Sequence, residues 1–143
     1  MNPQIDFAQL VGGIGDAVIV ANPEGQITYC NAAATRLFGF SETELVGQPL
    51  SVIVPERLRP RHTDGFSKSM ETGTTRYGTQ LLKVPALHKD GRTVSIAFSV
   101  AMLFGPDRTV TGVAAIIRDD TARFQEERSL KQRLAAYEAK AGS

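Results

Sequence analysis

The feature that most constrains the fold is a series of three strand-like stretches in the second half of the chain, at residues 77–87, 93–104 and 109–118. All three are rich in the β-branched and apolar residues that favour strands. Lys-Asp-Gly-Arg at 89–92 separates the first two, and Gly-Pro-Asp at 105–107 separates the last two. Turns this short connect antiparallel neighbours, so these stretches predict a three-stranded meander.

The first half of the chain predicts two further strands, at 17–21 and 26–30, joined by the Asn-Pro-Glu-Gly turn at 22–25. Apolar residues at close to helical spacing predict a short helix over 5–14 before these strands, which the glycines at its end would stop. A second helix is expected over 32–37, with Asn31 as its N-cap and Gly39 as its stop.

Two more helices are expected before the meander. Ser41 and Glu44 have the spacing of a capping box, which predicts a short helix that ends at Gly47. Residues 55–72 predict a longer helix, in which Pro60 breaks or kinks the first turn. Its apolar face would carry side chains spaced by four residues, namely Leu58, His62, Phe66 and Met70.

The last helix is expected over 122–141, a stretch without glycine or proline. Leu130, Leu134, Tyr137 and Ala141 follow 4-3-4 spacing, which is typical of a coiled-coil seam about two heptads long. We interpret this helix as the contact of a homodimer, because its apolar residues would otherwise be exposed together; the alternative is a solvated tail. The predicted organisation is a sensor domain over 1–121 and a signalling helix over 122–143.

The order of these elements predicts the α+β fold class: a five-stranded antiparallel sheet with short helices on one face and a C-terminal helix. Such an arrangement leaves an apolar cavity between the sheet and the short helices, where small ligands bind. The chain has 143 residues, which is the size of one domain with an ordinary core.

Composition excludes several classes of protein. The 16 basic and 15 acidic residues give a net charge of +1, so nucleic acid is not an expected partner. Cys30 is the only cysteine, which excludes an internal disulfide and suits a reducing cytoplasm. No apolar stretch approaches the roughly 20 residues that span a bilayer, so we expect a cytoplasmic protein without a membrane partner.

Several motifs, in this order along the chain, resemble those of the PAS family. They lie at 16–20, 25–34, 37–40 and 44–47 in the first half, and at 89–92 and 118–121 in the second half. The resemblance covers about residues 6–122. It implies a ligand-binding, dimerising signalling module that is not an enzyme and that acts on a downstream partner or effector domain.

Residues 55–62 also resemble the heme-bearing helix of oxygen-sensing PAS domains, those of nitrogen-fixation sensor kinases and of direct oxygen sensor phosphodiesterases. The resemblance places His62 on the residue that binds the iron of heme b, and a neutral imidazole can do so. The same register places further residues near the gas site: Tyr77, Gln80, Leu82, Phe98 and Val100.

Two of these residues depart from that subgroup. Leu82 stands where the subgroup has an arginine that hydrogen-bonds bound oxygen, and Gln80 stands where the phosphodiesterases have a ligating methionine. Gln80 or Tyr77 could still donate a hydrogen bond. The resemblance therefore implies five-coordinate ferrous iron that is open to O2, CO or NO.

Other interpretations stay open at this point. A PAS module without heme would act by dimerisation, by protein interaction or by holding another small ligand, and His62 would then pack locally. A hydrolase that uses Cys30, His62 and Asp64 is a third class, but no oxyanion-forming motif accompanies these residues. His88, beside the turn at 89–92, is expected to be a solvated histidine.

Overall fold

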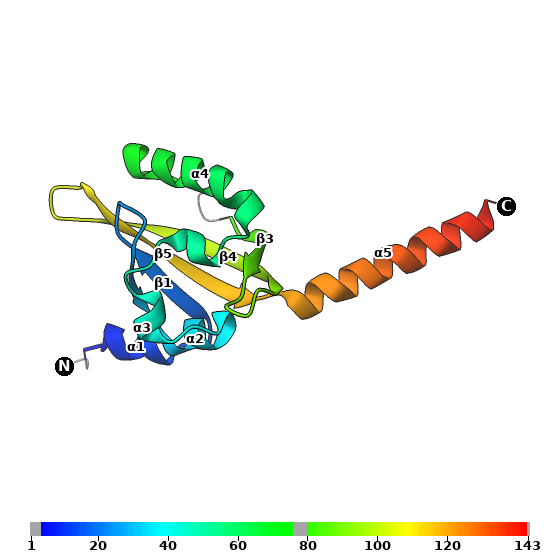
Figure 1. Cartoon of the computed structure of the whole chain (residues 1–143), viewed down its shortest axis with the longest axis horizontal. Coiled ribbons are helices and arrows are strands. Elements are labelled where there is room, and N and C mark those ends of the chain that lie inside the picture. The colour runs from blue at the N-terminus through cyan, green and yellow to red at the C-terminus, as the bar shows by residue number, and fades with distance from the viewer. Residues whose placement is uncertain (1–3, 76–79, 143) are drawn as a thin grey trace.

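The computed structural model describes residues 4–75 and 80–142 (Figure 1). Its helices and strands follow in this order: α1 (Phe7–Gly13), β1 (Ala17–Ala21), β2 (Ile27–Cys30), α2 (Ala32–Phe38), α3 (Glu42–Leu45), the 3₁₀ helices η1 (Leu50–Ile53) and η2 (Glu56–Leu58), α4 (Arg59–Thr72), β3 (Leu82–Leu87), β4 (Thr93–Phe104), β5 (Val110–Asp119) and α5 (Thr121–Ala141). None of the helices in these two ranges is long and apolar enough to cross a bilayer.

The strands form one five-stranded sheet in the order β2-β1-β5-β4-β3, and all neighbours are antiparallel. This confirms the predicted α+β fold class and the meander of β3, β4 and β5. The two halves of the chain meet where β5 pairs with β1, with Ala17 opposite Ile117. Helix α5 projects away from the sheet into solvent (Figure 1).

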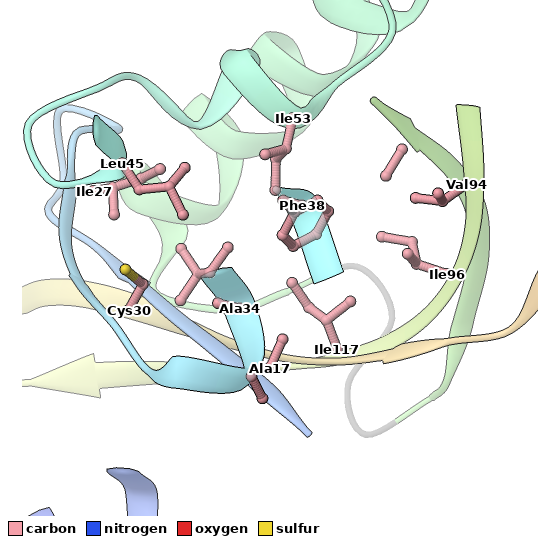
Figure 2. Close-up of a cluster of buried hydrophobic side chains, with 13 residues drawn as sticks. Ala17, Ile27, Cys30, Ala34, Phe38, Leu45, Ile53, Val94, Ile96 and Ile117 are labelled. Atoms are coloured by element: carbon pink, nitrogen blue, oxygen red, sulfur yellow. The ribbon is translucent and has the colours of Figure 1, made fainter. Parts of the chain in front are cut away.

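One face of the sheet, here called the inner face, carries the hydrophobic core. Alternate strand residues point to this face because side chains alternate along a strand. Phe38 of α2, Leu45 of α3 and Ile53 of η1 pack onto it from the helical side (Figure 2). The sheet contributes Ala17, Ile19, Ile27, Cys30, Ala86, Val94, Ile96 and Ile117. The core therefore lies between the sheet and the first group of short helices.

Asn31 joins this core to the N-terminal helix. It is the only polar residue among the buried residues described, with 3% of its surface exposed. Its Oδ1 accepts hydrogen bonds from the backbone N–H groups of Val18 and Ala34, and its Nδ2 donates to the carbonyls of Val11 and Asp16. The predicted N-cap of α2 is confirmed, and the same side chain also holds the end of α1 against the sheet.

The helix expected over 55–72 is divided in two. Residues 56–58 form η2, and α4 begins at Arg59 with Pro60 in its first turn, where the missing N–H of a proline has no cost. The break at Pro60 is confirmed. Leu58 lies in η2, so its predicted place on the same helix face as His62 was wrong.

Helix α4 lies over the inner face and extends toward the β4–β5 hairpin (Figure 1). At its start, Arg59 Nε donates hydrogen bonds to the carbonyls of Ser51 and Val54, each at 3.1 Å. Farther along, the ring of Phe66 packs against Gly25 in the β1–β2 turn. At its end, Gly73 contacts the side chain of Phe104. None of the residues of α4 is fully buried.

The start of β3 and the environment of His88, which follows β3, also differ from expectation. The strand was predicted to begin at 77, whereas β3 begins at Leu82, and residues 76–79 lie outside the described ranges. His88 is not a solvated histidine, since only 13% of its side chain is exposed. Its ring packs against Gly39 at the end of α2.

Candidate functional site

The strongest candidate for a ligand-binding side chain is His62, at the end of the first turn of α4. Its ring stacks with Phe66 one turn later, with the ring centres 6.4 Å apart and an angle of 24° between the planes. Because Phe66 contacts the β1–β2 turn, the helix face that these two residues share is directed toward the sheet.

The imidazole of His62 is half-buried, and this burial lowers its pKa because the charged form is desolvated. The ring is therefore neutral at pH 7 and has a lone pair available. None of the side chains or backbone groups in the described ranges forms a hydrogen bond with it. A neutral, partly buried imidazole without such a partner is suited to binding a metal.

Three of the residues assigned from the sequence lie on the inner face of the sheet. Leu82 on β3 lies directly opposite Phe98 on β4, and Val100 follows two positions along the same face. Phe98 also pairs with Ile117 of β5, which belongs to the core. The structure therefore brings Leu82, Phe98 and Val100 together on the inner face.

The inner-face side chains become more exposed along β4, from Val94 to Phe104. Val94 and Ile96 are each 5% exposed, whereas Phe98, Val100 and Met102 are only half-buried and Phe104 is 51% exposed. All of them point to the inner face, so the apolar surface continues beyond the packed core toward the end of α4. Met102 and Phe104 were not singled out from the sequence, although the same alternation along β4 would have identified them.

Two assigned residues are not among these three. Gln80 is exposed and precedes β3. Tyr77 lies outside the described residues. Of the three arginines just before His62, Arg59 donates to backbone carbonyls, while Arg57 and Arg61 are exposed.

His62 does not belong to a cluster of metal-binding side chains in the part of the chain that the structure describes. Within residues 4–75 and 80–142, no group of three or more His, Cys, Asp or Glu residues could hold a metal ion. A heme needs only one protein ligand together with an apolar, half-open surface for the macrocycle. His62 is the residue that could act as this ligand, and the half-buried part of the inner face along β4 is the apolar surface nearest in character.

A second concave region lies at the other end of the sheet. It is an open groove of about 380 Å³ between the start of β1, the end of β5 and α2. Asp16 and Arg118 line it and form an ion pair, with Arg118 Nη2 3.1 Å from Asp16 Oδ2. Leu37 and Arg36 of α2 also line it, but none of the assigned residues does.

Cys30 does not have the environment of a nucleophile. Its side chain is buried on the inner face, and burial together with the charge of Glu42 raises the pKa of its thiol. A thiol kept protonated is a poor nucleophile. It also lies on β2, whereas His62 and Asp64 are on α4, so the structure gives no support to the hydrolase interpretation.

A five-stranded antiparallel sheet in the order β2-β1-β5-β4-β3, with short helices over one face, defines a class of small sensory domains. The chain matches the PAS fold over residues 11–125. It therefore belongs to the PAS family of sensory and signal-transduction modules, as its motifs indicated.

The relatives that this chain matches are much larger proteins. The chain is 32% identical over 120 residues to the sensor protein FixL of Bradyrhizobium diazoefficiens, which covers 83% of this chain and 23% of FixL. It is 22% identical over 134 residues to the oxygen sensor protein DosP of Escherichia coli, which covers 94% of this chain and 16% of DosP. The chain thus spans less than a quarter of either relative.

Solved structures show the same fold at low identity. A PAS domain from Colwellia psychrerythraea has a TM-score of 0.71 at 24% identity, over 81% of this chain and 95% of that domain. An RNA-binding light-oxygen-voltage receptor has a TM-score of 0.74 at 17% identity, over 94% of this chain and 41% of the receptor.

Proposed function

We propose that this PAS module binds heme b through His62 and senses a diatomic gas. The observation that carries the proposal is the half-buried, neutral imidazole of His62, which lacks a hydrogen-bond partner among the described residues and shares the sheet-directed face of α4 with Phe66. The resemblance to oxygen-sensing PAS domains and the similarity to an oxygen sensor protein support it.

When bound, heme supplies ferrous iron that takes up O2, CO or NO at an open position. The residues of this chain would hold and shield that group. His62 would bind the iron from the α4 side, and the side chains of Leu82, Phe98 and Val100 would exclude water from the opposite side.

The output would pass from β4 to α5. The backbone of Ser95 on β4 donates to Thr121 Oγ1 at 3.2 Å and accepts from the N–H of Asp120 at 2.7 Å. Phe98 lies on the same strand, so a gas-dependent shift of β4 reaches the first turn of α5 directly. A ligand can drive such a change only when it binds the two conformations with different affinity.

Helix α5 is the proposed contact of a homodimer. Leu130, Leu134 and Tyr137 are exposed by 53%, 57% and 72%. In this proposal residues 1–121 form the sensor, residues 122–143 form the signalling helix, and a partner protein or effector domain reads the change in the dimer.

The test is hemin addition to the purified chain with absorption spectroscopy. We expect a Soret band for the wild type that is strongly reduced in His62→Ala. The control is His88→Ala, which removes the other of the two histidines and should retain the band. A missing band, or a band that persists unchanged in His62→Ala, contradicts the proposal and favours the alternative: a PAS interaction module without heme.

A further inference from the structure

We propose that the two copies of α5 pair in parallel and in register from Leu130 onward, and that Arg123 and Glu127 keep them apart next to the sensor domain. The inference rests on the proposed homodimer of α5. Four charged side chains beside the apolar seam set the orientation of the two helices.

The apolar residues of α5 define the heptad positions of this seam. Their 4-3-4 spacing places Leu130 and Tyr137 at d positions, and Leu134 and Ala141 at a positions. All four side chains are exposed, and none of the residues of α5 is buried, because the helix projects into solvent (Figure 1). The seam therefore has no partner within its own chain.

The same spacing continues toward the sheet over two charged residues, Glu127 at an a position and Arg123 at a d position. Arg123 donates hydrogen bonds to both carboxylate oxygens of Asp120 and to the carboxylate of Glu127. In a parallel dimer each a or d residue faces its own copy, so Arg123 would meet Arg123, and Glu127 would meet Glu127. Burial of like charges is costly, so the contact begins one turn later, at Leu130.

Asp120 attaches this charged start of the seam to the sheet. Its backbone N–H donates to the carbonyl of Ser95 on β4 at 2.7 Å, and only 12% of its side chain is exposed. Arg123 therefore holds the first two turns of α5 to the end of the sheet. A dimer contact that started at Arg123 would have to break this network.

Four charged side chains flank the apolar part of the seam at g and e positions: Glu126, Lys131, Arg133 and Glu138. In a parallel, in-register dimer, the g residue of one helix lies beside the e residue five positions later in the other helix. Glu126 then faces Lys131 of the other copy, and Arg133 faces Glu138 of the other copy. Both pairs are opposite in charge, and the twofold symmetry of the dimer doubles them.

These flanking charges lack partners in their own chain. All four side chains are exposed, and none of them forms an ion pair within residues 4–75 and 80–142. Arg133 has no acidic residue three or four positions away, and Glu138 has no basic residue there. The charges of α5 therefore complement a second, parallel copy of the same helix.

The first experiment measures the dissociation constant of the dimer by sedimentation equilibrium of the full chain. Arg133→Glu puts a like charge beside Glu138 of the other copy, so we expect the dimer to weaken about 10-fold. Adding Glu138→Arg to the same chain restores opposite charges and should return the constant to its wild-type value. Arg128→Glu is the matched control, because it makes the same charge change at a b position and should leave the constant near wild type.

The second experiment tests the charged start of the seam. Arg123→Leu/Glu127→Leu extends the apolar spacing by one heptad, so we expect the dimer to tighten about 10-fold or more. Gln125→Leu/Gln132→Leu adds the same two apolar side chains at f positions, on the opposite side of the helix. This control should leave the dissociation constant unchanged.

The third experiment reports the orientation. With oxidised glutathione as the oxidant, Ala141→Cys should form an interchain disulfide, because the two a positions face each other in a parallel dimer. In an antiparallel dimer they would lie at opposite ends of the seam. Ala139→Cys, at an f position, is the control that should not cross-link, and the native Cys30 is buried.

Three results would overturn the inference. The first is a loss in Arg133→Glu that Glu138→Arg does not restore, or no loss at all. The second is a dimer of Arg123→Leu/Glu127→Leu that is no tighter than the wild type. The third is a dimeric Ala141→Cys variant that does not cross-link. A wild-type chain that stays monomeric at every concentration overturns the homodimer itself, so the two failures are distinguishable.

Discussion

The imidazole ring of His88 lies directly against Gly39: a β-carbon on Gly39 would be 2.4 Å from Cε1 and 2.6 Å from Nε2 of the ring. His88 follows β3 and Gly39 ends α2. Next to this contact, the N–H of Lys89 donates to the carbonyl of Phe38 at 2.9 Å, and the ammonium of Lys89 pairs with Glu44. The β3–β4 turn is thus docked on the connection between α2 and α3.

We predict that Gly39→Ala lowers the free energy of unfolding by about 2–4 kcal/mol. Gly39 has φ +81, which disfavours a side chain, and the new methyl group would also collide with His88. The measurement is urea unfolding followed by circular dichroism. Gly47→Ala is the control, because Gly47 has φ +94 but nothing within 4 Å of a β-carbon; it should cost only about 1–2 kcal/mol.

The double variant Gly39→Ala/His88→Ala separates the two contributions. It should be more stable than the sum of the two single losses predicts, because the collision is absent once the ring is removed. Additive losses would show that the ring is free to move away.

Asn31→Ala should lower the free energy of unfolding by about 3 kcal/mol or more, because it leaves buried backbone groups of β1 and α2 without a partner. The matched control is Asn22→Ala. Asn22 accepts hydrogen bonds from the N–H groups of Glu24 and Gln26, but in an exposed turn, so its loss should cost about 1 kcal/mol. Similar losses in the two variants would contradict the central role of Asn31.

The ion pair between Lys89 and Glu44 predicts a pH dependence. The hydrogen bond from Lys89, followed by that from the backbone of Ser41, lowers the pKa of Glu44 from 4.5 to about 2. A lowered folded-state pKa means that the unfolded chain binds the proton more tightly. The stabilisation is therefore complete above about pH 4.5 and is lost as the pH falls toward 2.

Urea unfolding of wild type and Glu44→Gln between pH 7 and pH 3 checks this prediction. The two should differ most at pH 7 and converge as the pH falls, and added salt should reduce the difference because the pair is exposed. Glu24→Gln removes a carboxylate from the β1–β2 turn and is the control for the lost charge. A constant difference across the range would contradict the assignment.

The proposed dimer contact on α5 predicts that Leu130→Glu/Leu134→Glu is monomeric, because four added charges would meet in the seam of each dimer. Light scattering measures the mass. Gln125→Glu/Gln132→Glu adds the same charge on the opposite side of the helix and should keep the wild-type mass. Equal masses for the two double variants would exclude this helix face as the contact.

Features that depend on neighbours in the sequence could be predicted. The capping box of Ser41 and Glu44 and the break at Pro60 are set within one helical turn, and the structure has both. The meander followed from two short turns, which leave adjacent strands no other arrangement. The position of Leu58 was wrong because the effect of Pro60 extends back over the preceding turn.

Contacts between distant segments could not be predicted. His88 carries a polar ring beside a turn, which is the pattern of a solvated residue, and nothing near it in the sequence indicates that Gly39 covers it. The same holds for Phe66 against Gly25 and for Gly73 against Phe104, which place α4 over the inner face. The sequence suggested which residues would surround His62. The rising exposure of the inner-face side chains along β4 could not be predicted, because it depends on how far α4 extends over them.

The pairing of β1 with β5 has a mechanical consequence. Ala17 lies opposite Ile117 in an antiparallel ladder, so the chain enters β1 and leaves β5 at the same end of the sheet. Tension between α1 and α5 would therefore pull on the hydrogen-bonded residue pairs of this ladder one after another, which is the unzipping geometry. It would not load all of the pairs at once, as shear does. The ion pair between Asp16 and Arg118 lies just outside the first rung of this ladder, where the separation would begin. A domain held this way should open at low force, from the end where its two connecting helices are attached.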